Sequence, residues 1–85
     1  MAYESVLISP VSSEEAIAER EKNNVLTFYV SRSATKDKIK REIENRFKVK
    51  VIKVNVENTF KGKKAYVKLA PEFKATELPT NLGLL

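Results

Sequence analysis

Short runs of alternating or β-branched residues predict four strands. The clearest run covers 25–30, V-L-T-F-Y-V, and the two-residue period of a strand separates its side chains into two faces. One face consists of Leu26, Phe28 and Val30, and the other of Val25, Thr27 and Tyr29. A run over 5–8 should end at Ser9-Pro10, because proline lacks the N–H that a ladder needs. The remaining strands are expected over 49–57 and 64–70.

One segment has the clear periodicity of an amphipathic helix. Over 35–47, Ile39, Ile43 and Phe47 recur every four positions and form one apolar stripe. Thr35 is the expected N-cap of this helix. The side chains that should point away from the stripe are Lys38, Arg41 and Glu44.

A second helix is expected to begin at Ser12 and to end at Asn23-Asn24. Ser12 with Glu15 three residues later fits a capping box, and acids in the first turn suit the positive end of the helix dipole. The helix has few apolar positions, so we expect it to lie on the surface and to pack weakly.

The order of elements predicts one α+β domain over residues 1–85, a β-α-β-α-β-β sandwich of two or three layers with a mainly antiparallel four-stranded sheet. The second and third strands should be parallel, and the fourth could lie between them or outside the third. The core should form where the helix stripe meets one face of the last two strands. That face consists of Ile52, Val54, Val56, Ala65, Val67 and Leu69.

Charge is distributed unevenly along the chain. The net charge is +5, but residues 31–68 carry ten Lys and three Arg against four acids, a net charge of +9. Residues 1–30 sum to −3 and residues 69–85 to −1. This asymmetry indicates a polyanion, and nucleic acid above all, as the partner of the middle segment.

The outward face of the predicted sheet combines amines, aromatic rings and an amide. Its members are Lys53, Asn55, Lys64, Tyr66 and Lys68, joined by Thr27 and Tyr29. Amines neutralise phosphates, rings stack on bases or sugars, and an amide bonds to base or ribose edges. The alternative is that the tyrosines pack beneath the first helix while the lysines are solvated.

Two further sites for RNA are expected outside this face. The start of the helix expected over 35–47 offers free N–H groups to a phosphate, and Arg32, Thr35, Lys36 and Lys40 belong to this region. Alternatively, the Lys36 side chain simply extends outwards to water. The third site is the turn between the last strands, where Lys61, Lys63 and Lys64 flank Gly62.

Composition argues against catalysis. The chain has no cysteine and no histidine, the residue types that most often serve as nucleophile, metal ligand or general base. We therefore expect no enzyme activity, no cofactor and no metal. The N-terminal stretch lacks a basic region and a long apolar run, so we expect no signal peptide, no membrane insertion and a cytoplasmic protein.

Several motifs together resemble one family. They are A-T-K-D-K-I-K-R-E-I-E-N-R-F-K-V-K-V-I-K-V-N-V at 34–56, K-G-K-K-A-Y-V-K-L at 61–69, I-S-P-V-S-S-E-E at 8–15 and L-G-L-L at 82–85. In this order they resemble the universal large-subunit ribosomal protein numbered twenty-three, in its archaeal form. The resemblance covers essentially the whole chain.

This resemblance implies a structural protein of the ribosome, present there as a monomer. It would bind large-subunit rRNA at the rim of the nascent-chain exit tunnel, beside ribosomal protein twenty-nine. It would also help to form the docking surface for the signal recognition particle and the protein-conducting channel. Ser13-Glu14 match the S-E of a chaperone-docking stretch in bacterial relatives, which makes Glu14 a candidate docking residue. Glu14 could equally be a plain acid at a helix start.

The chain departs from the family in three places. Glu15 replaces the lysine of the bacterial docking stretch, and Val56 stands where threonine is frequent. The connection between the last two strands is short, so it should not extend far into the tunnel. The alternatives to a ribosomal role are a protein-interaction adaptor, a free single-strand RNA binder and, least supported by the residues, a small phosphatase-like enzyme.

Overall fold

The computed structural model describes residues 7–11 and 13–77. Its elements are β1 (Leu7–Pro10), α1 (Glu14–Asn23), β2 (Val25–Val30), α2 (Lys36–Phe47), β3 (Val51–Thr59), β4 (Gly62–Leu69) and a 3-10 turn over Ala75–Glu77. This order confirms the expected β-α-β-α-β-β arrangement. Residues 5 and 6 of the expected first strand, Ser12 and the terminal L-G-L-L lie outside the described residues.

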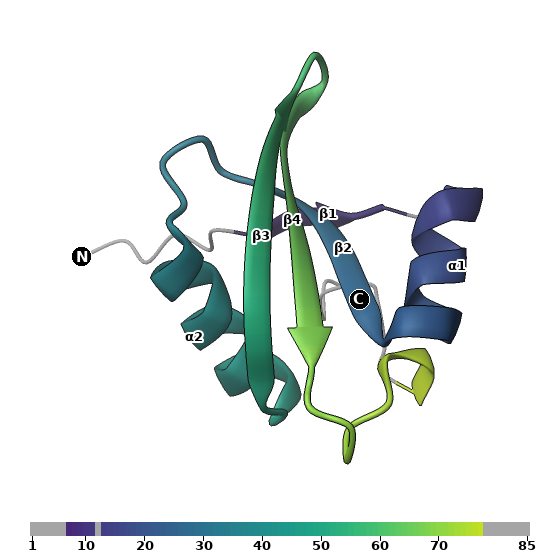
Figure 1. The fold of residues 1–85 in the computed structure, drawn as a ribbon. Helices are drawn as coiled ribbons and strands as arrows, with labels where there is room; N and C mark the ends of the chain where they lie inside the picture. The colour runs from purple at the N-terminus through teal and green to yellow at the C-terminus, as the bar shows by residue number, and fades with distance from the viewer. Residues whose placement is uncertain (1–6, 12, 78–85) are drawn as a thin grey trace.

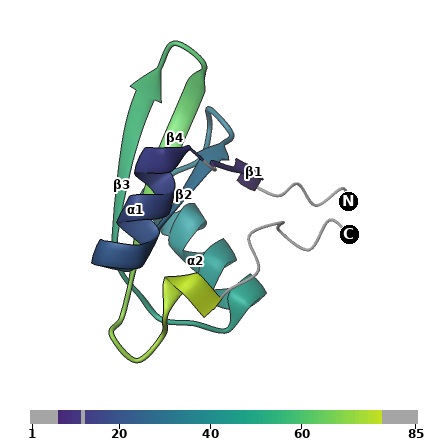
Figure 2. The ribbon, with the colours of Figure 1, turned by 90° about the vertical axis from the view of Figure 1, so that its right-hand side faces the viewer.

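The sheet has four strands in the order β1-β2-β4-β3, and all neighbours pair antiparallel. β4 therefore lies between β2 and β3, the first of the two positions that the sequence left open. The two helices lie on opposite sides of the sheet, which makes three layers (Figures 1 and 2). The β3–β4 hairpin extends beyond both helices in each view.

The core lies between α2 and the sheet. Ile39 and Ile43 are fully buried, and the ring of Phe47 stacks on that of Phe28 with 6.3 Å between centroids. Leu26, Phe28 and Val30 all face this side. The predicted helix stripe and the predicted face of β2 are thus confirmed, and Thr35 is the N-cap, its Oγ1 accepting from the Lys38 N–H.

The inward face of β3 differs from the prediction at Ile52. Val51 pairs with Leu69 and Lys53 with Lys68, so the register shifts between Val51 and Lys53 and leaves Ile52 as an extra residue. A bulge of this kind interrupts the alternation of faces. Ile52 is accordingly 52% exposed, whereas Val51 is 2% exposed and takes the core position. The remaining members of the predicted face are inward, with Val56 only partly buried.

Other expectations fail at the ends of elements. β1 does end at Pro10, but Ser9 and Pro10 belong to the strand instead of following it. Pro10 is paired with Phe28, which is allowed because β1 is an edge strand. The N-cap of α1 is Ser13, whose Oγ accepts from the Ala16 N–H at 3.2 Å. Glu15 is therefore one position too early for a capping box.

Glu44 also differs from its prediction, because it does not point away from the packed side of α2. Its Oε2 accepts a hydrogen bond of 2.9 Å from the Val51 N–H and joins the end of α2 to the start of β3. Sequence periodicity could not reveal this contact, since it depends on where the next strand begins.

Asn24 joins the end of α1 to the segment after β4. It takes the left-handed conformation (φ 60°) as C-cap of α1. Its Nδ2 donates to the carbonyls of Leu69, Ala70 and Phe73, and its Oδ1 accepts from the Ala75 N–H at 2.7 Å. These bonds fix α1 relative to the sheet even though only Ala16 of this helix is buried.

Candidate nucleic-acid interface

Strand register gathers five of the predicted RNA-binding residues on the outward face of the sheet. Tyr66 on β4 lies between Thr27 of β2 and Asn55 of β3. Lys68 is paired with Lys53. Lys64 lies opposite Tyr29, with its Nζ 5.8 Å from the ring centroid, a cation–π contact. Lys53, Asn55 and Lys68 are exposed, while Lys64 and Tyr66 are half-buried.

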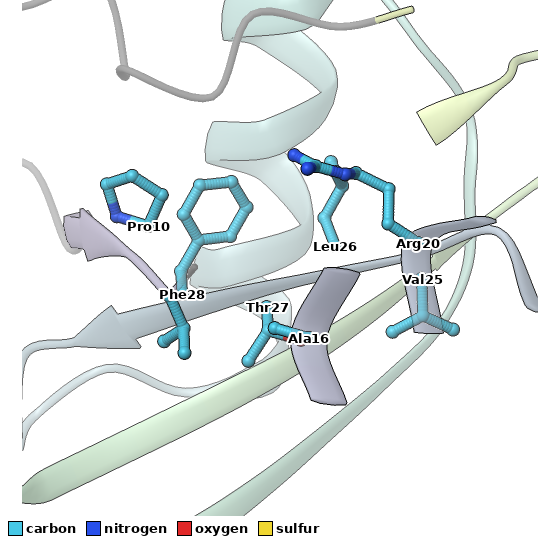
Figure 3. Close-up of a pocket in the computed structure, with 8 residues that line it drawn as sticks. Pro10, Ala16, Arg20, Val25, Leu26, Thr27 and Phe28 are labelled. Carbon is cyan, nitrogen blue, oxygen red and sulfur yellow. The ribbon is translucent and has the colours of Figure 1, made fainter. Parts of the chain in front are cut away.

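α1 covers one part of this face. Ala16 and Thr27 are both buried and line a small pocket together with neighbours from β1 and β2 (Figure 3). Thr27 is therefore removed from any outer surface, and its Oγ1 has no hydrogen-bond partner in the structure. The expectation that Thr27 belongs to an RNA-facing surface does not hold.

Acidic side chains from α1 line one wall of an open groove over the remaining face. The groove is lined by Glu15, Glu19, Asn23, Val25, Lys53, Asn55, Tyr66 and Lys68. The alternation of the strands predicts the lysines on this surface but not the glutamates, because it does not show that α1 lies over the same face. The groove consequently has mixed charge instead of being uniformly basic.

Glu57 is a third acid that was not predicted for this surface, although it shares the face of Lys53 and Asn55 by simple alternation. Its Oε1 accepts a hydrogen bond of 2.7 Å from the Tyr66 hydroxyl. This bond, followed by burial and the negative charges of Glu57 and Glu15, raises the pKa of Tyr66 to about 12. The Tyr66 hydroxyl is thus bonded within the protein, which leaves its ring and the neighbouring amines for a partner.

A second group of basic residues gathers where the hairpin meets the start of α2. The Lys63 Nζ donates to the carbonyl of Ala34 at 2.8 Å, so the two segments lie together. A hollow at this end is lined by Arg32, Asn58, Thr59, Gly62 and Lys63, with no acid among them. Arg32, Thr35 and Lys36 are exposed, and Lys36 is the first residue of α2.

The last predicted residues lie apart from the outward face. Lys61 is exposed in the turn of the hairpin, and Lys40 is exposed one helical turn after Lys36. Glu14, the predicted docking residue, is exposed at the start of α1. The structure thus places most of the predicted RNA-binding residues in two groups. The outward-face group consists of Lys53, Asn55, Lys64, Tyr66 and Lys68, and the hairpin-end group of Arg32, Lys36, Lys61 and Lys63. Thr35 and Lys40 belong to neither group.

Neither a metal centre nor a membrane span is evident in the part of the chain that the structure describes. Within residues 7–11 and 13–77, no three acids come together to hold a metal ion. In the same ranges, no helix has the length and apolar character needed to cross a bilayer. Fold and surface together define a small three-layer α+β protein with exposed amines around one hairpin.

Comparison with known proteins gives the family. The model of the family "Ribosomal protein L23" matches residues 5–68. The "Large ribosomal subunit protein uL23" of Picrophilus torridus is 47% identical over 78 residues, covering 92% of this chain and 95% of the relative. The protein of the same name from Thermoplasma acidophilum is 48% identical over 79 residues, covering 93% and 94%. The chain belongs to the ribosomal protein L23 family.

Membership confirms the resemblance that the sequence motifs carried, including its archaeal character. A protein of this family is a structural constituent of the cytoplasmic ribosome and not an enzyme, as the composition and motifs predicted.

Proposed function

We propose that the chain is a constituent of the large ribosomal subunit that binds large-subunit rRNA near the exit of the nascent-chain tunnel. The observation that supports this most directly is the hairpin-end group, Arg32, Lys36, Lys61 and Lys63. Arg32 and Lys63 line a hollow without acids, while Lys36 and Lys61 are exposed at the start of α2 and in the hairpin turn. The hairpin extends beyond both helices (Figures 1 and 2). Phosphate groups bind where cations converge and no carboxylate repels them.

The outward-face group supports the same function but should make shallower contacts with phosphates than the hairpin-end group. Lys53 and Lys68 are exposed side by side and can meet a phosphate backbone along the strands. Asn55 is exposed next to them and can bond to ribose or base edges. Glu15 and Glu19 on the opposite wall repel phosphates that enter deeply. We therefore assign the main phosphate contacts to the hairpin end, and shallower contacts to Lys53, Asn55 and Lys68.

The mechanism requires no bond to be made or broken. Amines replace condensed counterions on the RNA, and release of those counterions makes binding depend steeply on salt. The sheet and the hydrogen bond from Lys63 to Ala34 hold the amines in a fixed arrangement. Shape then selects folded RNA over an extended strand.

The experiment that tests this proposal neutralises three exposed cations of the hairpin end, Arg32→Gln, Lys36→Gln and Lys61→Gln, in one variant. The affinity for deproteinised large-subunit rRNA is measured across a salt series. Each lost phosphate contact lowers the slope of log affinity against log salt by roughly 0.7 to 0.9, so a variant that loses three contacts should lose about 2 to 3 units of slope.

The matched control removes the same charge elsewhere. Lys22, Lys50 and Lys74 are exposed and lie outside both groups. The triple variant Lys22→Gln, Lys50→Gln and Lys74→Gln should retain the slope of the wild type. Equal slopes for the two triple variants would show that net charge, and not the hairpin end, governs binding.

The mixed-charge groove and the exposed acids of α1 suggest a protein partner on this side. We extend the proposal to docking of exit-site proteins there: ribosomal protein twenty-nine, the signal recognition particle and the protein-conducting channel, with Glu14 in contact. Capture of these partners after ribonuclease treatment distinguishes direct docking from tethering by RNA. Glu14→Ala should reduce direct capture without changing rRNA affinity. Unchanged capture would remove Glu14 from the docking surface.

A further inference from the structure

Phe60 occupies the turn of the β3–β4 hairpin with its side chain 100% exposed. Within residues 7–11 and 13–77, the other large exposed apolar residues are Ile8, Ile17 and Ile52, and they keep 36–57% of their surface exposed. Scattered apolar residues on a protein surface are common. A fully exposed aromatic residue in the turn of a hairpin that extends beyond both helices is less common and points to a partner (Figures 1 and 2).

The turn that carries Phe60 is held by side-chain bonds. The Thr59 Oγ1 donates to the Gly62 carbonyl at 2.6 Å and accepts from the Lys61 N–H at 3.2 Å. Gly62 takes a φ of 141°, a conformation that side chains rarely adopt, while Phe60 and Lys61 keep negative φ. The ring is therefore presented from an ordered turn, and binding need not first fix the backbone.

The surroundings of Phe60 determine the chemistry of the partner. From Asn58 to Lys64 the sequence has three lysines and no acid, and Arg32 lies at the same end. An apolar pocket in another protein would bury the ring but would leave these cations unmatched. A second copy of the chain would bring the lysines of two hairpins together, with repulsion between them. An RNA segment supplies both phosphates for the amines and a flat ring for stacking.

We propose that Phe60 stacks on an unpaired base of large-subunit rRNA, while Lys61 and the free donors of Lys63 contact the flanking phosphates. The inference rests on the proposed function and adds one aromatic contact to it. Stacking supplies affinity that is independent of salt, whereas the amines supply the part that salt weakens.

Fluorescence tests the stacking directly in the full chain. The protein has no tryptophan, so Phe60→Trp introduces a single reporter at the turn. Addition of deproteinised large-subunit rRNA should quench this tryptophan, because a stacked base contacts the indole. The control is Ile52→Trp at the far end of β3, about 25 Å away by strand rise. Ile52 is also exposed but lies beside Lys53, which we assign only a shallow contact, so its variant should be quenched clearly less than Phe60→Trp.

The affinity for rRNA supplies a second test, which distinguishes stacking by an aromatic ring from contact by any apolar side chain. Phe60→Ala and Phe60→Leu should each weaken rRNA binding about five- to a hundredfold, the range for loss of one base–aromatic stack, with the salt slope unchanged. Phe60→Trp should bind about as well as the wild type. Because the ring has no contacts in the folded chain, these variants should unfold at the same denaturant concentration as the wild type.

Three outcomes would overturn the inference. Wild-type affinity of Phe60→Leu would show an apolar contact without stacking. Absence of quenching in Phe60→Trp at saturating rRNA would place the ring off the RNA. A change in tryptophan emission with protein concentration alone would identify a second copy as the partner.

Failure of this inference can be distinguished from failure of the proposed function. If the Arg32, Lys36 and Lys61 variant has a lower salt slope while every Phe60 variant binds normally, this inference fails and the proposed function stands. If the wild type does not bind rRNA, the proposed function itself fails.

Discussion

The ammonium group of Lys63 on β4 donates a hydrogen bond of 2.8 Å to the carbonyl of Ala34, just before α2. Ala34 is 1% exposed, so its carbonyl has little access to water as an alternative donor. A lysine ammonium has three donors, of which this bond uses one. Lys63 can therefore hold the hairpin against the start of α2 and still contact a phosphate.

This double role predicts that Lys63 and Lys61 differ in their effects on stability. Lys63→Met keeps the aliphatic stem but leaves the Ala34 carbonyl without its donor, which should lower the free energy of unfolding by about 1–2 kcal/mol. Lys61 is exposed in the turn, and Lys61→Met should stay within about 0.5 kcal/mol of the wild type. Urea unfolding followed by circular dichroism measures both. Equal stabilities would mean that the bond contributes nothing.

The hydrogen bond between Tyr66 and Glu57 predicts that the free energy of unfolding depends on pH. The pKa of Tyr66 is about 12 in the fold against 10.0 for the free side chain, so folding favours the neutral phenol. Its contribution to stability should be fully present below pH 10 and lost as the pH rises from 10 to 12. Ionisation breaks the bond because the phenolate cannot donate to the carboxylate.

Alkaline titration of phenolate absorbance tests this shift. Subtracting the titration of Tyr66→Phe from that of the wild type isolates Tyr66 from the other tyrosines. Its midpoint should lie near 12 and should fall towards 10 in Glu57→Gln, which removes the negative charge. A midpoint near 10 in the wild type would contradict the bond.

The sequence was sufficient for those parts of the fold that follow from a regular period. The four-residue spacing of Ile39, Ile43 and Phe47 predicted the buried side of α2, and alternation over 25–30 predicted both faces of β2. The exposure of Ile52 was not predicted, because one extra residue in β3 reverses the alternation of its two faces. A bulge depends on pairing with another strand and is not visible in the period of one strand alone.

The candidate site was predictable in composition but not in arrangement. Alternation placed Lys53, Asn55 and Tyr66 on one face, and the same rule should have included Glu57. It could not show that α1 lies over Thr27, since that position depends on the bonds of Asn24 to a segment more than forty residues away. The bonds of Asn24 hold α1, and with it Glu15 and Glu19, over part of the predicted outward face, which gives that face mixed charge.

Asn24 should stabilise the fold in two separable ways, through its left-handed backbone conformation and through the hydrogen bonds of its side chain. Asn24→Gly accommodates the left-handed φ of 60° but loses the bonds to Phe73 and Ala75, which should lower the free energy of unfolding by about 2 kcal/mol. Asn24→Ala should cost about 1 kcal/mol more, because a residue with Cβ is strained in this conformation. Urea unfolding of both variants gives the comparison. Equal losses would show that the backbone conformation changes in the variants.

The buried hydroxyl of Thr27 predicts that a less polar residue is more stable at this position. The Thr27 side chain lies beneath Ala16 of α1, and its Oγ1 has no hydrogen-bond partner in the structure (Figure 3). Burial of an unpaired hydroxyl costs free energy that an apolar group of the same shape does not. Thr27→Val should therefore raise the free energy of unfolding by about 1 kcal/mol. The control Thr27→Ser keeps the hydroxyl, loses the methyl group and should lower it. If Thr27→Val were the less stable variant in urea unfolding, the hydroxyl would have to be satisfied within the small pocket under α1.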